Sequence, residues 1–143
     1  MIAIDTNVLV RYITQDIPEQ AKTAARLLDR LTPNYPGFVS REVVIETVWV
    51  LERSYGFSRA QTAEVLTTLV GAESLIIEED DSVARATFVY EQGGADFSDL
   101  AILLASQRAG CERVYTFDRR FARIDGVELL NDESVSAIEP MLS

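Results

Sequence analysis

Two aspartates stand directly after apolar segments that have the length of short strands. Asp5 follows Ile2-Ala3-Ile4, and Asp118 follows the segment 114–117. In an open parallel sheet, ligands bind beyond the carboxyl ends of the strands, so both carboxylates are expected at the edge where sites form. The alternative is that each aspartate only caps the next helix, because aspartate is a favoured N-cap residue.

A glutamate interrupts an otherwise apolar helix. Between residues 43 and 51 only Glu46 and Thr47 are polar, so we expect this helix to be largely buried. A buried carboxylate is costly unless it is paired or bound to a cation. Glu46 is therefore either a metal-site residue or one half of a salt bridge to Arg53 or Arg11.

The run Asp96-Phe97-Ser98-Asp99 precedes an apolar helical segment at 100–105. Asp96 fits the N-cap, and Asp99 falls in the first turn, where the helix dipole favours a negative charge. That position also directs the Asp99 carboxylate toward the strand ends that carry Asp5 and Asp118. A structural and a chemical role remain open for Asp99.

Together, Asp5, Glu46, Asp99 and Asp118 are expected to converge at one end of a sheet. Carboxylates a few ångströms apart repel one another, and a bound cation would offset this repulsion. Oxygen ligands without histidine or cysteine suit Mg²⁺ or Mn²⁺, which activate water and stabilise charge on a phosphate. Polar neighbours that can orient water or a carboxylate there are Thr6, Asn7, Ser98 and Thr116.

The elements that must position these side chains alternate along the whole chain. We expect strands at 2–4, 38–39, 75–77, 114–117 and 127–130, and helices at 6–14, 18–31, 41–54, 59–70, 80–92 and 96–110. This alternation predicts one α/β domain over residues 1–143. Its centre is a mostly parallel sheet of about five strands with helices on both faces.

Composition excludes several other chemistries. The chain has 143 residues, 48% of them hydrophobic, a net charge of −10, one cysteine and no histidine. There can be no Ser-His-Asp triad, no Cys-His pair and no histidine-ligated zinc. Cys111 alone forms no internal disulfide, which fits a reducing compartment. The longest apolar run, 100–105, is too short to cross a bilayer, so we expect a cytoplasmic protein without a membrane partner.

Four blocks of the sequence, in order, resemble a PIN domain, and most closely a toxin of the VapC type. They are Ile4-Asp5-Thr6-Asn7, the segment 40–51 with Glu46, the segment Asp96 to Ile102, and Thr116-Phe117-Asp118. The blocks and their spacing extend from residue 2 to about residue 130. The resemblance implies the PIN-like fold for the predicted domain.

The resemblance also implies an activity, a magnesium-dependent endoribonuclease held inactive by a cognate antitoxin. By position, Asp5, Glu46, Asp99 and Asp118 match the family's acidic residues, with Asp5 and Asp99 as metal ligands. Thr116 matches a polar position beside the fourth acid, and Asp96 matches an additional acid. A homodimer is a further implication of the resemblance.

Arginines near the acids are candidates for holding RNA phosphates, although the net acidic charge argues mildly against nucleic acid as a partner. All but one of the 13 basic residues are arginine, whose planar guanidinium grips phosphate in a bidentate way. The candidates are Arg41, Arg119, Arg120 and Arg123. The alternative is an exposed helix face with solvated charges. Trp49 is expected in the core, and Phe57 is a candidate contact for an antitoxin.

Two other functions are alternatives for an acid-bearing α/β chain of this kind. A phosphoaspartyl phosphatase also places an aspartate after its first strand, but it needs a second aspartate two residues later, where Asn7 stands. It needs a lysine as well, and Lys22 lies in a helix away from the strand ends. The other alternative is a non-catalytic RNA- or protein-binding PIN module. Without a cation, the repulsion among its four carboxylates would destabilise it, which disfavours this alternative.

Overall fold

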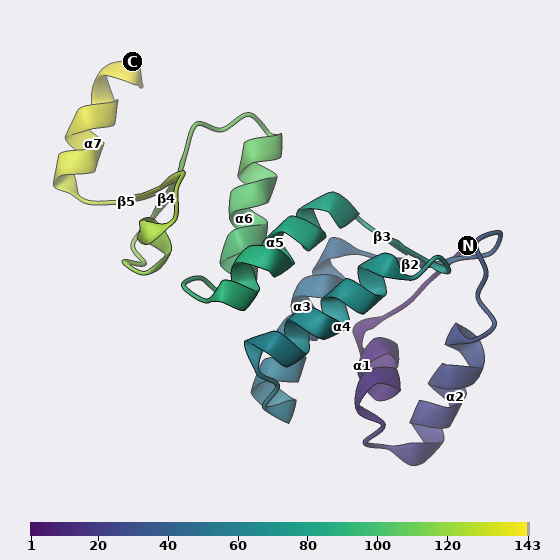
Figure 1. The fold of residues 1–143 in the computed structure, drawn as a ribbon. Coiled ribbons are helices and arrows are strands. Elements are labelled where there is room, and N and C mark those ends of the chain that lie inside the picture. Colours follow the sequence, from purple (N-terminus) through teal and green to yellow (C-terminus); the bar gives the residue numbers. More distant parts are fainter. Residues whose placement is uncertain (143) are drawn as a thin grey trace.

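Strands and helices alternate as expected in the computed structural model, which describes residues 1–142 (Figure 1). Ser143, the last residue of the predicted domain, lies outside the described residues. The elements are β1 Ile2–Ala3, α1 Thr6–Thr14, α2 Pro18–Leu28, β2 Gly37–Val39, α3 Arg41–Tyr55, α4 Arg59–Gly71, β3 Leu75–Ile77, α5 Asp80–Gln92, α6 Phe97–Arg108, β4 Val114–Thr116, β5 Val127–Leu129 and α7 Asp132–Ile138. Short 3₁₀ turns occupy Phe121–Arg123 and Glu139–Met141.

The ends of the long helices follow local sequence chemistry. The Ser40 hydroxyl accepts a hydrogen bond from the Val43 amide (3.2 Å) and caps α3. Ser58 and Gln61 form a reciprocal capping box at the start of α4. Between these helices Gly56 adopts φ +66°, a left-handed conformation that glycine enters without a Cβ clash. The α3–α4 hairpin is thus defined by two serines and one glycine.

The five predicted strands form, but they make two sheets. β1, β2 and β3 pair in parallel in the order β1-β2-β3, while β4 and β5 pair in parallel with each other. The prediction of one sheet of about five strands is therefore wrong: the main sheet has three.

The position of α6 separates the sheets. Arg108, at the end of α6, donates a hydrogen bond to the Ser82 hydroxyl (2.7 Å) and pairs with Glu79 (3.6 Å). The chain therefore enters β4 from a helix already held against α5. In Figure 1, α6 lies between the β4–β5 pair and the β1–β3 sheet.

Helices cover one face of the three-stranded sheet. Ile4, Val39 and Ile77 are buried in the main hydrophobic core on that face. The opposite face carries the adjacent residues Ala3, Phe38 and Ile76, and Ile76 is 46% exposed there. Parallel sheets normally have both faces covered. The predicted helical cover on both faces is thus incomplete along this row.

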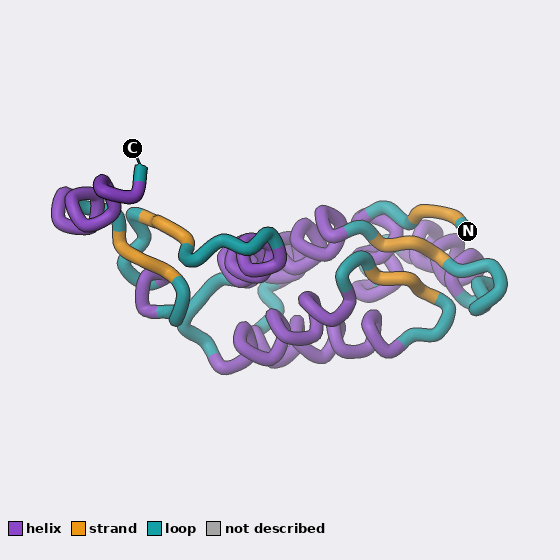
Figure 2. The backbone as a smooth tube through the Cα atoms, turned by 90° about the horizontal axis from the view of Figure 1, so that it is seen from above, coloured by secondary structure: helices purple, strands orange, loops and turns teal. Residues whose placement is uncertain are grey.

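A small second core joins the C-terminal strands to α6. Leu103 of α6 is buried together with Phe121 and Val127, and Val114 and Ile124 pack around them. Figure 2 shows the two groups of strands at opposite ends of the molecule, and the two chain termini also lie at opposite ends. No helix in residues 1–142 is long and apolar enough to cross a membrane.

Candidate active site in two parts

Asp5 lies at the end of the first strand and caps α1. Its Oδ1 accepts a hydrogen bond from the Thr6 amide (2.7 Å), and its side chain is exposed to solvent. Thr6 is buried, and its hydroxyl has no hydrogen-bond partner among the described residues. The carboxylate of Asp5 therefore remains accessible to a ligand even though it caps a helix.

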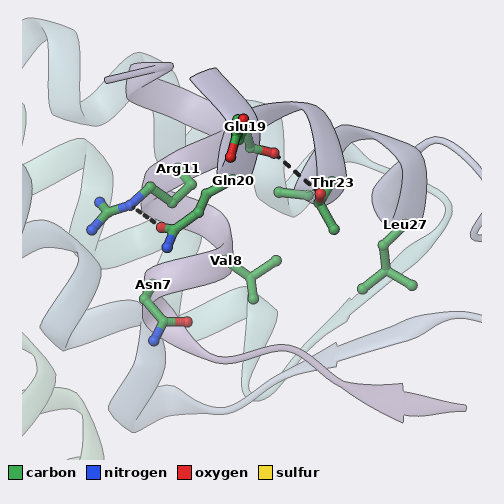
Figure 3. A pocket seen from close by; sticks show the side chains of 8 residues that line it. Asn7, Val8, Arg11, Glu19, Gln20, Thr23 and Leu27 are labelled. Atoms are coloured by element: carbon green, nitrogen blue, oxygen red, sulfur yellow. Dashed lines mark hydrogen bonds between the residues drawn. The ribbon is translucent and has the colours of Figure 1, made fainter. Parts of the chain in front are cut away.

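Asn7 opens onto a groove between α1 and α2 (Figure 3). The groove has a volume of about 590 Å³ and is lined by Asn7, Val8, Arg11, Glu19, Gln20, Thr23, Ala24 and Leu27. Arg11 donates from Nε to Oε1 of Gln20 (2.8 Å) and pairs with Asp16 (3.5 Å). None of the four motif acids lines this groove, so it is not the site that they would form.

Glu46 lies on the exposed side of α3, contrary to the prediction that this helix is largely buried. The buried residues of α3 are Val44, Thr47, Val48 and Leu51, whose spacing defines one stripe. The apolar residues between them reach solvent on the other side. Trp49, expected in the core, is 56% exposed.

The predicted salt-bridge partners of Glu46 are engaged elsewhere. Arg11 pairs with Asp16, and the Arg53 guanidinium lies 5.6 Å from the centre of the Trp49 ring. Glu46 has no ion pair in the described part of the chain. It is thus a solvent-accessible carboxylate.

The start of α6 is held in place by an arginine that the motifs did not single out. Arg59 Nη1 donates to the backbone oxygens of Tyr90 (2.8 Å) and Ala95 (2.7 Å). Its Nη2 lies 3.6 Å from Asp96, whose side chain makes no capping hydrogen bond of its own. Arg59 thereby fixes the turn that precedes Asp99. No local sequence pattern predicts this contact between residues far apart in the chain.

Asp99 is half-buried, and its pKa is raised above the ordinary value. Desolvation is the largest cause, followed by repulsion from the carboxylates of Asp96 and Asp118. The structure therefore brings Asp99 within electrostatic reach of two predicted site residues. Ser98, beside it, is exposed.

Asp118 is fixed by backbone hydrogen bonds. Its Oδ1 accepts hydrogen bonds from the amides of Arg120 (2.9 Å) and Phe121 (3.1 Å), in the turn that leads into the 3₁₀ segment. The Thr116 hydroxyl accepts from the Asp118 amide (3.0 Å). Thr116 thus orients the backbone at Asp118.

The arginine candidates also divide between the two ends of the molecule. Arg119, Arg120 and Arg123 are exposed around Asp118, and none of them has an ion pair within residues 1–142. Arg41 lies at the start of α3, where its amide donates to Oε1 of Glu78 (2.8 Å). Only the three later arginines adjoin Asp118 in the chain.

The predicted site residues therefore fall into two half-sites. We group as the first half-site Asp5, which follows β1, and Glu46, on the helix α3 that follows β2. The second half-site is Asp96, Asp99 and Asp118, at the start of α6 and the end of β4. Among the described residues no group of three acids is arranged to hold a metal ion. The expected convergence of all four acids does not occur within one chain, because Asp118 follows a strand of the other sheet.

Comparison with known proteins identifies the family. The PIN domain family matches residues 2–127, which include both half-sites. A protein named VapC ribonuclease, from Aquifex aeolicus strain VF5, is 27% identical over 125 residues, covering 87% of this chain and 92% of that relative. The chain belongs to the PIN domain family.

Proposed function

We propose that this chain is an endoribonuclease that hydrolyses phosphodiester bonds in RNA and is neutralised by a cognate antitoxin protein. The observation that carries the proposal is the PIN match over residues 2–127 together with an acid at each of the four motif positions. The similarity to a relative named VapC ribonuclease supports the same reaction. Residues 1–143 would act as one domain.

The proposal assigns catalysis to Asp5, Glu46, Asp99 and Asp118, with Thr6, Asn7, Asp96, Ser98 and Thr116 as supporting polar groups. A purely carboxylate donor set suits Mg²⁺ or Mn²⁺, with Asp5 and Asp99 as ligands. The half-sites do not fit a cation within one chain, since no three acids in the described residues surround a common point. Cation dependence is therefore supported by ligand chemistry and by the family alone.

The residues of the second half-site suit the proton and charge requirements of hydrolysis. Water attacks phosphorus and loses a proton, while the leaving 3′ oxygen gains one, which yields a 5′-phosphate and a 3′-hydroxyl. Without histidine, a carboxylate or water must carry that proton. Asp96 and Asp118, which are not assigned as cation ligands, are the carboxylates of this half-site for that task. Arg119, Arg120 and Arg123 supply cations for the RNA backbone.

An exposed aromatic surface supports an antitoxin as partner. Trp49 is 56% exposed on α3, beside a cavity of about 150 Å³ that Ile45, Val48 and Phe97 help to line. The same cavity is also lined by polar residues, Glu52 and Arg53 among them, and exposed tryptophan is typical of protein interfaces. Phe57, the earlier candidate, lines a separate groove with Tyr12 and Leu69.

Cleavage of single-stranded RNA with Mg²⁺, Mn²⁺ or a chelator tests the activity. We expect cation-dependent cleavage by the wild type and at least a roughly 100-fold loss in Asp99→Asn. Asp81→Asn is the matched control, because Asp81 also lies in the first turn of a helix. RNA binding without cleavage by the wild type would instead indicate a non-catalytic module. Turnover of a small phosphate ester would indicate a phosphatase.

A further inference from the structure

In the described residues, four strands have an unpaired edge, namely β1, β3, β4 and β5. β1 has β2 as its one neighbour, and β4 has β5 as its one neighbour. The amides of Ile2 and Ile4 bond toward β2, so the Ala3 peptide groups face away from it. The Val114 amide and the Thr116 oxygen bond toward β5, so the Tyr115 peptide groups face away in the same manner. Such edges are templates for pairing with another strand.

Of these free edges, those of β1 and β4 adjoin the two halves of the acidic site. Asp5 follows β1, and Asp118 follows β4. If β1 and β4 paired in parallel, their carboxyl ends would meet at one edge, as in every strand pair of this protein. That pairing would bring Asp118, with Asp99 in its electrostatic reach, beside Asp5.

The β4–β5 pair is kept from β1 of its own chain by the packing of α6. Phe97 and Leu100 of α6 are each 3% exposed in the main core, and Phe97 packs edge-on against Tyr90 with ring centres 5.8 Å apart. Arg59 holds the start of this helix, and Glu79 and Ser82 hold its end. The strand pair is packed on this fixed helix through Leu103, Phe121 and Val127, so moving β4 to its own β1 would break that small core.

We infer that a second copy of this chain supplies the missing neighbour. β4 of each copy pairs with β1 of the other, which creates two five-stranded parallel sheets of the order β3-β2-β1-β4-β5. This exchange of the β4–β5 strand pair forms a closed dimer with two-fold symmetry, because each copy provides its strand pair to the other and receives the other's pair. The inference deepens the proposed function: each catalytic site contains Asp5 and Glu46 from one copy and Asp99 and Asp118 from the other.

Exposed apolar side chains of the single copy fit this assembly. The uncovered sheet row includes Ile76, 46% exposed, beside Phe38 and Ala3. α6 exposes Ile102 (51%), and α5 exposes Phe88 (68%). Uncovered apolar surface of this kind marks an interaction site. A second copy that brings its own α6 with β4 would carry apolar surface to the uncovered row.

Mixing inactive variants tests the exchange. Asp5→Asn and Asp118→Asn are each expected to be inactive. After joint refolding of equal amounts, about half of the dimers are mixed, and each mixed dimer contains one site with all four acids. The mixture should therefore recover about a quarter of the wild-type rate. A mixture of Asp99→Asn with Asp118→Asn is the control, because both changes affect the same half-site and no dimer contains an intact site.

A second measurement separates this inference from the proposed activity. In a Cys111→Ser background, Ala3→Cys and Tyr115→Cys chains of different mass are mixed under oxidation, and light scattering gives the molar mass without oxidant. We expect a dimer and a disulfide between the two chain types, because neighbouring strands lie within disulfide reach. A monomer, or a wild type that cleaves RNA while the first mixture recovers nothing, overturns the exchange. A cross-linked dimer that cleaves no RNA overturns the activity alone.

Discussion

The ionised carboxylate of Asp99, which the proposed reaction uses, is destabilising in the folded chain. Burial and the carboxylates of Asp96 and Asp118 raise its pKa above the ordinary 3.8. Between that value and the raised one, the folded chain binds more protons than the unfolded chain, so stability falls as pH rises through this window. We expect Asp99→Asn to melt higher than the wild type at pH 7.

The difference in melting temperature between Asp99→Asn and wild type should shrink on acidification and vanish below about pH 3.8. Thermal melts across pH measure it, with Asp81→Asn as the comparison. Equal melting temperatures for Asp99→Asn and wild type at pH 7 would mean that the carboxylate is not destabilised in the folded chain.

Thr47 offers a second test at the scale of single residues. It is fully buried, and its hydroxyl has no hydrogen-bond partner among the described residues. Thr47→Val should therefore stabilise the protein by about 1 kcal/mol, because an unsatisfied polar group is removed without a change of shape. Thr87 is also buried, but its hydroxyl donates to the Val83 oxygen (2.7 Å). Thr87→Val should destabilise by about 1 kcal/mol in denaturant unfolding. The same sign for both variants would contradict this account.

The aspartates after apolar segments correctly predicted where strands end, whereas the burial of single helical residues was harder to infer from the sequence. Asp5 and Asp118 follow strands as the sequence indicates. Glu46 was misplaced because nearly every neighbour in 43–51 is apolar, yet α3 buries one stripe and exposes residues such as Trp49 on the other side. Composition alone does not say which apolar residues of a helix meet a core.

At the scale of elements, the C-terminal strands depend on a small core. Leu103, Phe121 and Val127 are its buried residues. Leu103→Ala should cost about 2–5 kcal/mol and loosen the contact between α6 and the strand pair. Hydrogen exchange should then accelerate at the amides of 114–129 more than in β1–β3.

Leu66→Ala is the counterpart in the main core, where Leu66 is 1% exposed. It should accelerate exchange in the first sheet instead. If Leu103→Ala loosened both sheets equally, the two cores would not be separate cooperative units.

All five strands were predicted within one or two residues, because short apolar runs between turn and cap residues are strong local signals. Their pairing was not predictable in the same way. A strand of two or three residues, such as β1 or β4, contains too little pattern to specify which edge it joins. The contacts of Arg59 and Arg108 that place α6 join residues far apart in sequence. Such tertiary contacts decided the division into two sheets.

At the scale of the whole molecule, the net charge of −10 opposes RNA binding. Contact with RNA must then depend on a local cationic segment, and Arg119, Arg120 and Arg123 have no ion pair in the described residues. Replacing all three by glutamine should weaken binding and reduce the salt slope, by about 0.7 per lost phosphate contact on single strands.

Fluorescence anisotropy at several salt concentrations measures this slope. Glutamine in place of Arg26 on α2, Arg30 in the turn after α2 and Arg85 on α5 serves as the charge-matched control. Equal slopes for the two triple variants would show that the segment after Asp118 does not contact the RNA backbone.

A single cation site built from both half-sites is tested by thermal melting of the wild type with and without millimolar Mn²⁺, compared with Asp5→Asn and Asp118→Asn. A cation held by acids from both half-sites should raise the wild-type melting temperature by several degrees. Each variant should lose most of that rise, although the two acids belong to different sheets of the chain. A rise that survives in both variants would contradict a single site built from the two half-sites.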